Sequence, residues 1–378
     1  MNIAFFVDSY VPVASGMVVS VETLRLSLEG MGHNVYVLAP RYRDWNKNEP
    51  RICRMSAKFS RSNRLKPIKY PVYSHKREQL AKLNLNIIHC HFEHDTYGYG
   101  AKIARTFQIP LFATYYKVFP YEIKHEKGFL GRRHYHSSAK RLIDYSKECD
   151  KIIALSTTQR QIMQNFGVIT PIEVLPVGIF TKDYSSVPKE SLRKQYSIKE
   201  NRIILYVGSI DNRGNINEIL RVFKIINKTM DDIHLLIVGE EGKDINIRQL
   251  VAKQSFSDKI TFAGAIPKTA INKIYGAADL LIYPKTLDPE PLVILESLAA
   301  GTPVVAQTGV GAQDFIVNNQ DGLIADDNSE DFADKIMLLL KRERLRLDLS
   351  LKARLDAQNY RASKLTGDLL ELYESQIG

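Results

Sequence analysis

The chain has 378 residues, 44% hydrophobic and 25% charged, with a formal net charge of +10. That length suits two domains of ordinary size, and no apolar run approaches the roughly 20 residues of a membrane-spanning helix. Cys53, Cys90 and Cys149 have neither disulfide nor zinc-site spacing. Residues 2–7 look like a first strand rather than a signal peptide. We therefore expect a globular cytoplasmic protein with reduced cysteines.

Apolar strand-like runs alternate with helical periodicity along almost the whole chain. In the first half, strands are expected at 2–7, 34–39, 87–92, 110–116, 151–156 and 172–177, and helices at 17–31, 97–107, 137–147 and 157–166. In the second half, strands are expected at 202–208, 234–239, 260–263, 280–283, 303–306 and 322–325, and helices at 216–226, 245–253, 270–277, 292–300 and 329–340. Such dense, non-alternating apolar strands are typical of parallel sheets covered on both faces.

The pattern predicts an α/β protein with two doubly wound, Rossmann-like domains. We expect the first domain at 1–179, the second at 180–357, and a C-terminal helix at 358–378 that crosses back to the first domain. Ligands of such sheets bind beyond the carboxyl ends of the strands, so the site is expected in a central cleft that both domains face.

The segment Arg41–Arg77 carries the whole charge excess, because its twelve basic residues face only two acidic ones and the rest of the chain is balanced. Aromatic side chains are interleaved with these cations, as at Trp45 and Tyr70. This pattern favours contact with an anionic membrane surface. The alternatives are a solvated loop without a partner and a groove for nucleic acid. Of the three we expect the membrane surface, and we expect no nucleic-acid partner.

Three polar clusters follow expected strands of the first half. Residues 8–16, ending in Gly16, lead from a strand into a helix whose N-terminus could meet an anion or a sugar oxygen. His91 and Glu93 close a second strand, where a sugar or acceptor edge is favoured over a metal site. The third cluster comprises Tyr115, Tyr116 and Lys117; packing in the core is an equal alternative for both tyrosines.

Two carboxylates in the second half form the most specific pattern. Asp288 precedes an expected helix and Glu296 lies inside it, so both are expected near the same cleft. A carboxylate can accept paired hydrogen bonds from the vicinal hydroxyls of a ribose or hexose. The alternative for Glu296 is that its side chain only pairs with another side chain on the surface of the helix. Farther on, Gly309 and Gly311 follow a strand and precede a helix, a setting that lets backbone amides approach a diphosphate.

Together these segments resemble the retaining GT-B glycosyltransferases of family 4, which include bacterial diacylglycerol glucosyltransferases and phosphatidylinositol mannosyltransferases. The resemblance covers nearly the whole chain and is most specific over 260–306. It implies an N-terminal acceptor domain, a C-terminal donor domain and transfer without a bound metal or other cofactor. It also implies that Glu296 contacts the nucleotide ribose and that Asp288 lies near the donor sugar. Gly309 and Gly311 would then lie near the diphosphate.

The sequence departs from this family at several functional positions. Ser209 and Gly214 stand where the family usually has an Arg and a Lys that hold the diphosphate, and Tyr116 stands in place of a His. Asp288 replaces a Glu, and Pro291 replaces a Gly. The missing cations remove charge-assisted bonds of about 1.5–3 kcal/mol each; Arg213, Lys285 or Lys117 could compensate.

We therefore expect a hexosyltransferase at the inner face of the cell membrane. It would use a UDP- or GDP-sugar and a lipid acceptor such as diacylglycerol, or a cell-envelope glycan precursor. A catalytically silent subunit of a partner glycosyltransferase is the main alternative, and a nucleotide-sugar epimerase is a second. The expected catalytic residues are Asp288, Glu296 and Tyr116, and those of the acceptor cleft are His91, Glu93, Tyr115 and Lys117. The expected donor-binding residues are Gly16, Ser209, Arg213, Lys285, Glu290, Pro291, Leu292, Val293, Glu296, Gly309 and Gly311.

Overall fold

The computed structural model describes residues 1–13, 15–42, 45, 49–55, 58–59, 67–69, 74–92, 97–117, 139–184, 188–211, 214–242 and 246–377. Contacts divide the chain into two compact units. Unit 1 comprises Met1–Gly178 and Ala362–Gly378, and unit 2 comprises Ile179–Arg361. Among the described residues, no helix combines the length and apolarity needed to cross a bilayer.

Unit 1 is built on a seven-stranded parallel sheet in the order β3-β2-β1-β6-β7-β8-β9. Its strands are β1 (Asn2–Val7), β2 (Asn34–Pro40), β3 (Ile52–Met55), β6 (Ile87–Phe92), β7 (Leu111–Tyr115), β8 (Lys151–Ala154) and β9 (Ile172–Val174). Every residue of β6 and β7 is buried, as expected for central strands covered on both faces. A separate antiparallel pair joins β4 (Lys58–Phe59) to β5 (Pro67–Lys69).

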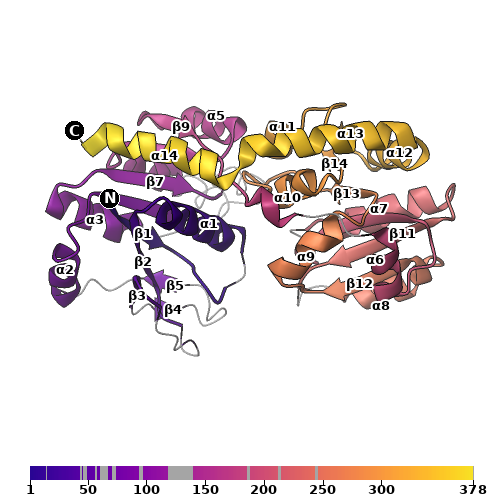
Figure 1. Cartoon of the computed structure of the whole chain (residues 1–378), viewed down its shortest axis with the longest axis horizontal. Coiled ribbons are helices and arrows are strands. Elements are labelled where there is room, and N and C mark those ends of the chain that lie inside the picture. Colours follow the sequence, from indigo (N-terminus) through magenta and orange to yellow (C-terminus); the bar gives the residue numbers. More distant parts are fainter. Residues whose placement is uncertain are drawn as a thin grey trace. The chain divides into compact units, whose positions relative to one another are not determined.

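The helices of unit 1 include one element from the far end of the chain. They are α1 (Gly16–Gly30), α2 (Ser74–Ala81), α3 (Tyr97–Phe107), residues 139–146, α5 (Thr157–Asn165) and α14 (Ala362–Ile377). Ser15 caps α1 by accepting a hydrogen bond from the Val18 amide, which satisfies one of the free donors of a helix start. The C-terminal helix α14 packs beside α1 (Figure 1) and buries Tyr373 completely.

Unit 2 has a six-stranded parallel sheet in the order β12-β11-β10-β13-β14-β15. Its strands are β10 (Arg202–Val207), β11 (Ile233–Val238), β12 (Ile260–Gly264), β13 (Leu280–Tyr283), β14 (Val304–Gln307) and β15 (Gly322–Ala325). Its helices are α6 (Lys189–Tyr196), α7 (Ile216–Asn227), α8 (Ile247–Ala252), α9 (Lys268–Tyr275), α10 (Leu292–Ala300), α11 (Ala312–Phe315), α12 (Ser329–Lys341) and α13 (Glu343–Asp356). Short 3₁₀ turns lie at Thr181–Asp183, Ser257–Lys259 and Ala357–Tyr360.

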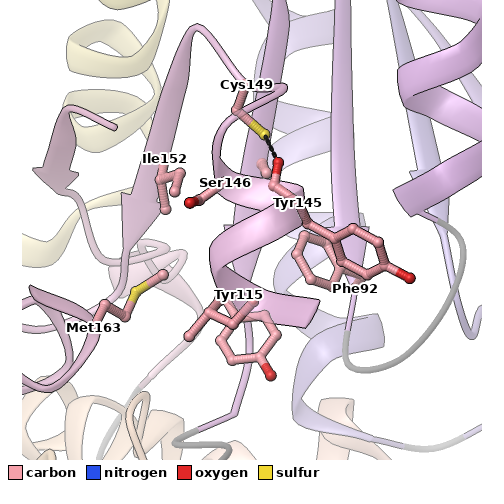
Figure 2. A pocket seen from close by; sticks show the side chains of 9 residues that line it. Phe92, Tyr115, Tyr145, Ser146, Cys149, Ile152 and Met163 are labelled. Atoms are coloured by element: carbon pink, nitrogen blue, oxygen red, sulfur yellow. Dashed lines mark hydrogen bonds between the residues drawn. The ribbon is translucent and has the colours of Figure 1, made fainter. Parts of the chain in front are cut away.

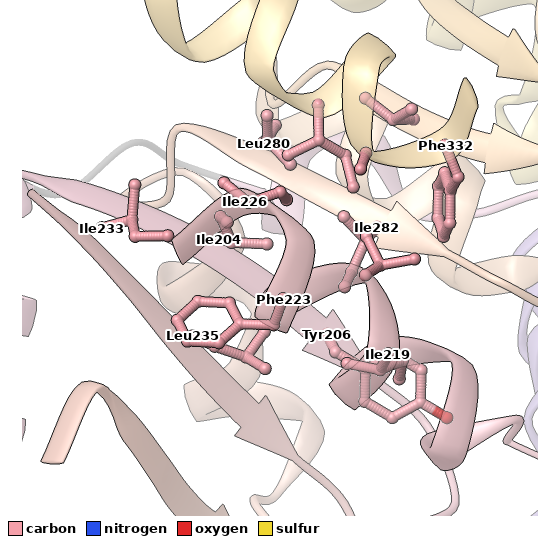
Figure 3. Close-up of a cluster of buried hydrophobic side chains, with 14 of the residues drawn as sticks. Ile204, Tyr206, Ile219, Phe223, Ile226, Ile233, Leu235, Leu280, Ile282 and Phe332 are labelled. Atoms are coloured by element: carbon pink, nitrogen blue, oxygen red, sulfur yellow. The ribbon is translucent and has the colours of Figure 1, made fainter. Parts of the chain in front are cut away.

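The core of unit 2 lies between the sheet and the helices α7 and α12. Figure 3 shows Phe223 and Ile226 of α7 against Ile204 and Leu235 of the sheet, with Phe332 of α12 nearby. These side chains are at most 2% exposed. Burying each one contributes about 1.5–3 kcal/mol relative to an exposed position, so this layer fixes the strands whose ends carry the polar loops.

The two parallel sheets and the α/β class agree with the prediction from the apolar runs. The prediction missed β3, because its residues lie in the basic segment and lack a long apolar run. It also missed α6, which lies in the polar stretch after the first unit. The last helix starts at Ala362, because residues 357–360 form a 3₁₀ turn that stays with unit 2.

Both sheets reverse their strand order at one point, where ligands of doubly wound folds bind. In unit 1 this switch point lies between β1 and β6, and in unit 2 it lies between β10 and β13. We therefore expect the binding and catalytic residues among those that follow these four strands.

Candidate functional site

The loops after β13 and β14 in unit 2 are joined backbone to backbone. The Asp288 amide donates to the Val310 carbonyl at 3.2 Å, and the Val310 amide donates to the Thr286 carbonyl at 2.8 Å. A Cβ at Gly309 would lie 2.4 Å from the Thr286 oxygen, and one at Gly311 would lie 1.8 Å from the Asp288 oxygen. Gly311 also has a φ of 95°, a conformation that favours glycine. The two glycines thus allow the contact that holds Asp288 in place.

Asp288 and Lys285 form a charged pair on this joined loop. Asp288 Oδ2 accepts a hydrogen bond from the Tyr283 hydroxyl at 2.7 Å, and Lys285 Nζ lies 3.6 Å from the same oxygen. Both side chains keep partial solvent contact, at 26% and 21% exposure. Burial, followed by the charge of Asp288, raises the pKa of Tyr283, so the phenol remains a hydrogen-bond donor. One carboxylate and one cation are therefore available at the end of β13.

Glu296 lies in α10 and is 8% exposed. Its Oε2 accepts a hydrogen bond from the Tyr275 hydroxyl at 2.8 Å. At the start of the same helix Glu290, Pro291 and Leu292 are buried and Val293 is half-buried. The sequence predicted both carboxylates as candidates, but it missed Tyr275 and Tyr283, whose hydroxyls donate to them.

The loop between β10 and α7 folds tightly on itself. The Tyr206 hydroxyl lies 2.9 Å from the Ser209 carbonyl oxygen and 3.1 Å from that of Gly214. The Gly214 amide donates to Asp211 Oδ1 at 3.0 Å, and a Cβ at Gly214 would lie 1.8 Å from the Ser209 oxygen. The lysine common at this position in the related family would not fit this loop.

A side chain of the same region connects this loop to Lys285. Asn215 Nδ2 donates to the Pro284 carbonyl oxygen at 3.1 Å, so the start of α7 is joined to the residue just before Lys285. Arg213, another of the three compensating cations suggested by the sequence, lies outside the described residues. Lys285 is thus the described cation that the fold holds next to the position where the usual cations are missing.

In unit 1, the loop after β1 is fixed from two sides. The Asp8 amide donates to the His91 carbonyl at 3.3 Å, and the Tyr10 amide donates to the Tyr42 hydroxyl oxygen at 3.3 Å. Gly16 is exposed at the first residue of α1, and a Cβ there would meet nothing within 4 Å. The structure therefore leaves space at the first residue of α1.

His89 and His91 form a buried, stacked pair on β6. Their ring centroids are 4.1 Å apart, and both rings are fully buried. His89 is hydrogen-bonded to the Tyr373 hydroxyl at 2.5 Å and to Thr114 Oγ1 at 2.7 Å, and His91 Nδ1 lies 3.1 Å from the Tyr116 hydroxyl. Burial lowers the pKa of His89 to about 3 and lowers that of His91, so both rings are neutral near pH 7.

Tyr115 and Tyr116 have different surroundings. Tyr116 reaches His91, whereas the Tyr115 ring lies 5.0 Å from that of Phe92, and both rings line a small apolar pocket of about 10 Å³ (Figure 2). The packing alternative therefore describes Tyr115, and we remove it from the candidate cleft. Lys117 is half-buried, and Glu93 lies outside the described residues.

Most of the basic segment Arg41–Arg77 also lies outside the described residues. Of its described cations, Arg54 pairs with Glu49 at 2.6 Å and lies 5.4 Å from the Tyr10 ring centroid. Arg51 lies 3.4 Å from Glu29 and is 45% exposed. Arg54 is only 10% exposed, so we assign it a structural role rather than a surface one.

Two family models match the chain in succession. "Glycosyltransferase Family 4" matches residues 14–183, and "Glycosyl transferases group 1" matches residues 188–356. With two parallel-sheet units, these matches define a glycosyltransferase of the GT-B class. The chain belongs to the family-4 group of these enzymes.

Relatives and solved structures agree with this class. An alpha-monoglucosyldiacylglycerol synthase of Streptococcus pneumoniae is 28% identical over 81% of this chain and 71% of its own length. The synthase of the same name from Acholeplasma laidlawii is 23% identical over 87% of this chain and 86% of its own. The sucrose-phosphate synthase of Thermosynechococcus elongatus has the same fold, with a TM-score of 0.80 at 19% identity over 99% of this chain and 98% of its own.

Proposed function

We propose that this glycosyltransferase is a retaining enzyme that transfers a hexose from a UDP- or GDP-sugar to a membrane lipid such as diacylglycerol. The observation that carries the proposal is the placement of Asp288, Lys285 and Glu296 around the switch point of unit 2. This arrangement offers separate groups for a sugar, a diphosphate and a ribose.

In the proposed donor site, Glu296 accepts hydrogen bonds from the ribose hydroxyls, and Asp288 accepts them from hydroxyls of the donor sugar. Lys285 and the backbone at Gly309 and Gly311 hold the diphosphate. In the reaction, the bond from the sugar C1 to the diphosphate breaks and a bond to the acceptor oxygen forms on the same face. The acceptor proton passes to the departing diphosphate. Because Lys285 supplies positive charge there, we expect activity to survive EDTA.

Unit 1 supplies the proposed acceptor side. Tyr116, ordered by the neutral His91, presents a phenol where the related family has a His. A neutral group can orient an acceptor hydroxyl without repelling or protonating it. The open N-terminus of α1 at Gly16 adds backbone donors.

The lipid acceptor and the membrane association rest on two observations. The similar proteins of Streptococcus pneumoniae and Acholeplasma laidlawii are named alpha-monoglucosyldiacylglycerol synthases, and the segment Arg41–Arg77 carries the charge excess of the chain. We propose a peripheral enzyme at the cytoplasmic face of the membrane. Flotation with vesicles containing anionic lipid tests this step, and no binding at physiological salt would contradict it.

A catalytically silent subunit is the second candidate, favoured by Ser209, Gly214 and Tyr116, which replace functional residues of the family. Binding and slow hydrolysis of a panel of UDP-, GDP- and ADP-sugars separates the two candidates. The transferase proposal predicts specific binding with slow hydrolysis, both lost in Glu296→Ala. Failure to bind any donor would favour the silent subunit.

A further inference from the structure

Three polar side chains meet inside unit 2, from segments far apart in the sequence. Glu296 lies in α10, Tyr275 ends α9, and Tyr184 follows the 3₁₀ turn at Thr181–Asp183. Tyr275 is fully buried and Tyr184 is 8% exposed. Their rings pack edge to face with centroids 6.2 Å apart, so both phenols are held beside one carboxylate.

The two hydroxyls differ in their partners. The Tyr275 hydroxyl donates to Glu296 Oε2 at 2.8 Å. The Tyr184 hydroxyl is buried beside Glu296, which helps to raise its pKa, but the two groups are not aligned as a regular hydrogen bond. A buried hydroxyl without an aligned partner is unfavourable and needs an explanation. A small rotation of Glu296 would provide that alignment.

Both phenols stay neutral over the working pH range. Burial, followed by the nearby Glu296 charge, raises the pKa of Tyr184 and of Tyr275. They therefore remain donors toward the carboxylate. An ionised carboxylate has about four acceptor positions, so it can accept from both phenols and still bind a vicinal diol.

The backbone at Tyr275 is anchored without help from its hydroxyl. Thr302 Oγ1 donates to the Tyr275 carbonyl at 2.5 Å, and Ser297 Oγ donates to the Thr302 carbonyl at 2.8 Å. Replacing Tyr275 by Phe should thus remove one hydrogen bond and leave the end of α9 in place. The hydroxyl is available for a positioning role that can be tested separately from folding.

We propose that Tyr275 and Tyr184 are positioning residues. They hold Glu296 in the orientation in which it accepts hydrogen bonds from both ribose hydroxyls, and so make unit 2 selective for ribonucleotides. This inference rests on the proposed function and adds the residues that set its sugar selectivity. Tyr275 holds the carboxylate through its hydrogen bond to Oε2. When the ribose binds, Glu296 turns to engage Tyr184 as well.

The test compares UDP, GDP and ADP with their 2′,3′-dideoxy forms by calorimetry on the full chain. The variants are Tyr275→Phe, Tyr184→Phe and Glu296→Ala, with Tyr196→Phe on α6 as the matched control. Wild type should prefer the ribonucleotide by about tenfold or more, because a site built for a hydroxyl rejects its deoxy analogue. Thermal unfolding of each variant checks that the fold is retained.

Tyr275→Phe should weaken ribonucleotide binding by about tenfold and Tyr184→Phe by about threefold, as expected for bonds to a charged group. Dideoxynucleotide binding should stay within about twofold in both, and Tyr196→Phe should match wild type. If both phenylalanine variants keep the full ribose preference, the inference is wrong although the proposed function stands. If wild type binds no nucleotide, the proposed function fails and the inference with it.

Discussion

The two units use their switch points in opposite ways. Unit 1 buries the titratable pair His89 and His91, which has no charged hydrogen-bond partner among the described residues, and burial lowers both pKa values, so the two rings are neutral near pH 7. Unit 2 keeps charge at the corresponding place, with Asp288 beside Lys285 at partial exposure. The difference follows from burial and partners, since a charge is retained only where a counter-charge or hydrogen-bond donors surround it.

This contrast fits a division of labour. A leaving diphosphate develops charge and needs fixed charges and donors around it. An acceptor hydroxyl is neutral and needs orientation. Substitutions in one unit at a time test this contrast.

The largest effect is expected at the joined loops of unit 2. Gly311→Ala forces a Cβ to within 1.8 Å of the Asp288 oxygen at a φ of 95°. We expect a loss of about 3 kcal/mol or more in unfolding free energy and loss of donor binding, because strain and a backbone clash add. Calorimetric unfolding and nucleotide titration measure both.

Gly32→Ala is the matched control for this change. Gly32 also has a positive φ, of 88°, but a Cβ there meets nothing within 4 Å. Gly32→Ala should lower the unfolding free energy by about 1 kcal/mol through backbone strain alone, and it should leave donor binding unchanged. Equal effects of the two substitutions would show that the contact between the loops is unimportant.

Lys285→Met tests whether the charge of unit 2 is used for the diphosphate. Donor affinity should fall by about tenfold or more, because a charge-assisted bond is worth about 1.5–3 kcal/mol. The salt dependence of binding should also weaken. Lys335→Met is the control, since Lys335 makes a similar exposed pair with Asp331 at 3.3 Å on α12. Unchanged affinity for a nucleoside diphosphate in Lys285→Met would assign the diphosphate to another group.

The neutral pair of unit 1 predicts a pH dependence of stability. The pKa of His89 is about 3 in the fold and about 6.5 when unfolded. Between these values only the unfolded state binds the proton, so stability falls as pH falls from about 6.5 toward 3. His89→Gln should reduce this slope by up to about 1.4 kcal/mol per pH unit.

Fluorescence of Trp45, the single tryptophan, follows unit 1 during denaturant unfolding. Tyr145→Phe, a change in the same unit away from the histidine pair, serves as the control and should keep the wild-type slope. An unaltered slope in His89→Gln would mean that the ring is not buried in a neutral form in solution.

The smallest effect concerns α14. Tyr373→Phe removes the hydroxyl that bonds to His89 and should destabilise unit 1 by about 1 kcal/mol, the usual net value of a hydrogen bond. Amide hydrogen exchange should then show faster opening of α14 and little change in β10. Loss of protection in both units would contradict a local role for this bond.

Much of this arrangement could be predicted from sequence because it is local. The apolar run 87–92 gave β6 with the right bounds, and the spacing of Asp288 and Glu296 marked two carboxylates around one helix. The partners of these carboxylates are not local. Tyr275 and Tyr184 come from a helix end and a short turn with no motif of their own, and only the fold brings them together.

The basic segment Arg41–Arg77 shows what a charge count leaves out. Within it, Arg54 turns inward to Glu49 and the Tyr10 ring, because β3 runs through this stretch and its short, mixed sequence does not indicate a strand. Charge counts describe a segment as a whole. They do not show which individual cations are paired by the fold.

The most direct test of the proposed function is hexose transfer itself. Purified protein would be incubated with UDP-glucose or GDP-mannose and vesicles of diacylglycerol in anionic lipid, with mass spectrometry and NMR of the lipid product. We expect a glycolipid that keeps the anomeric configuration of the donor and is absent with Glu296→Ala. Nucleotide binding without product from any donor would contradict the proposed function and identify a catalytically silent protein.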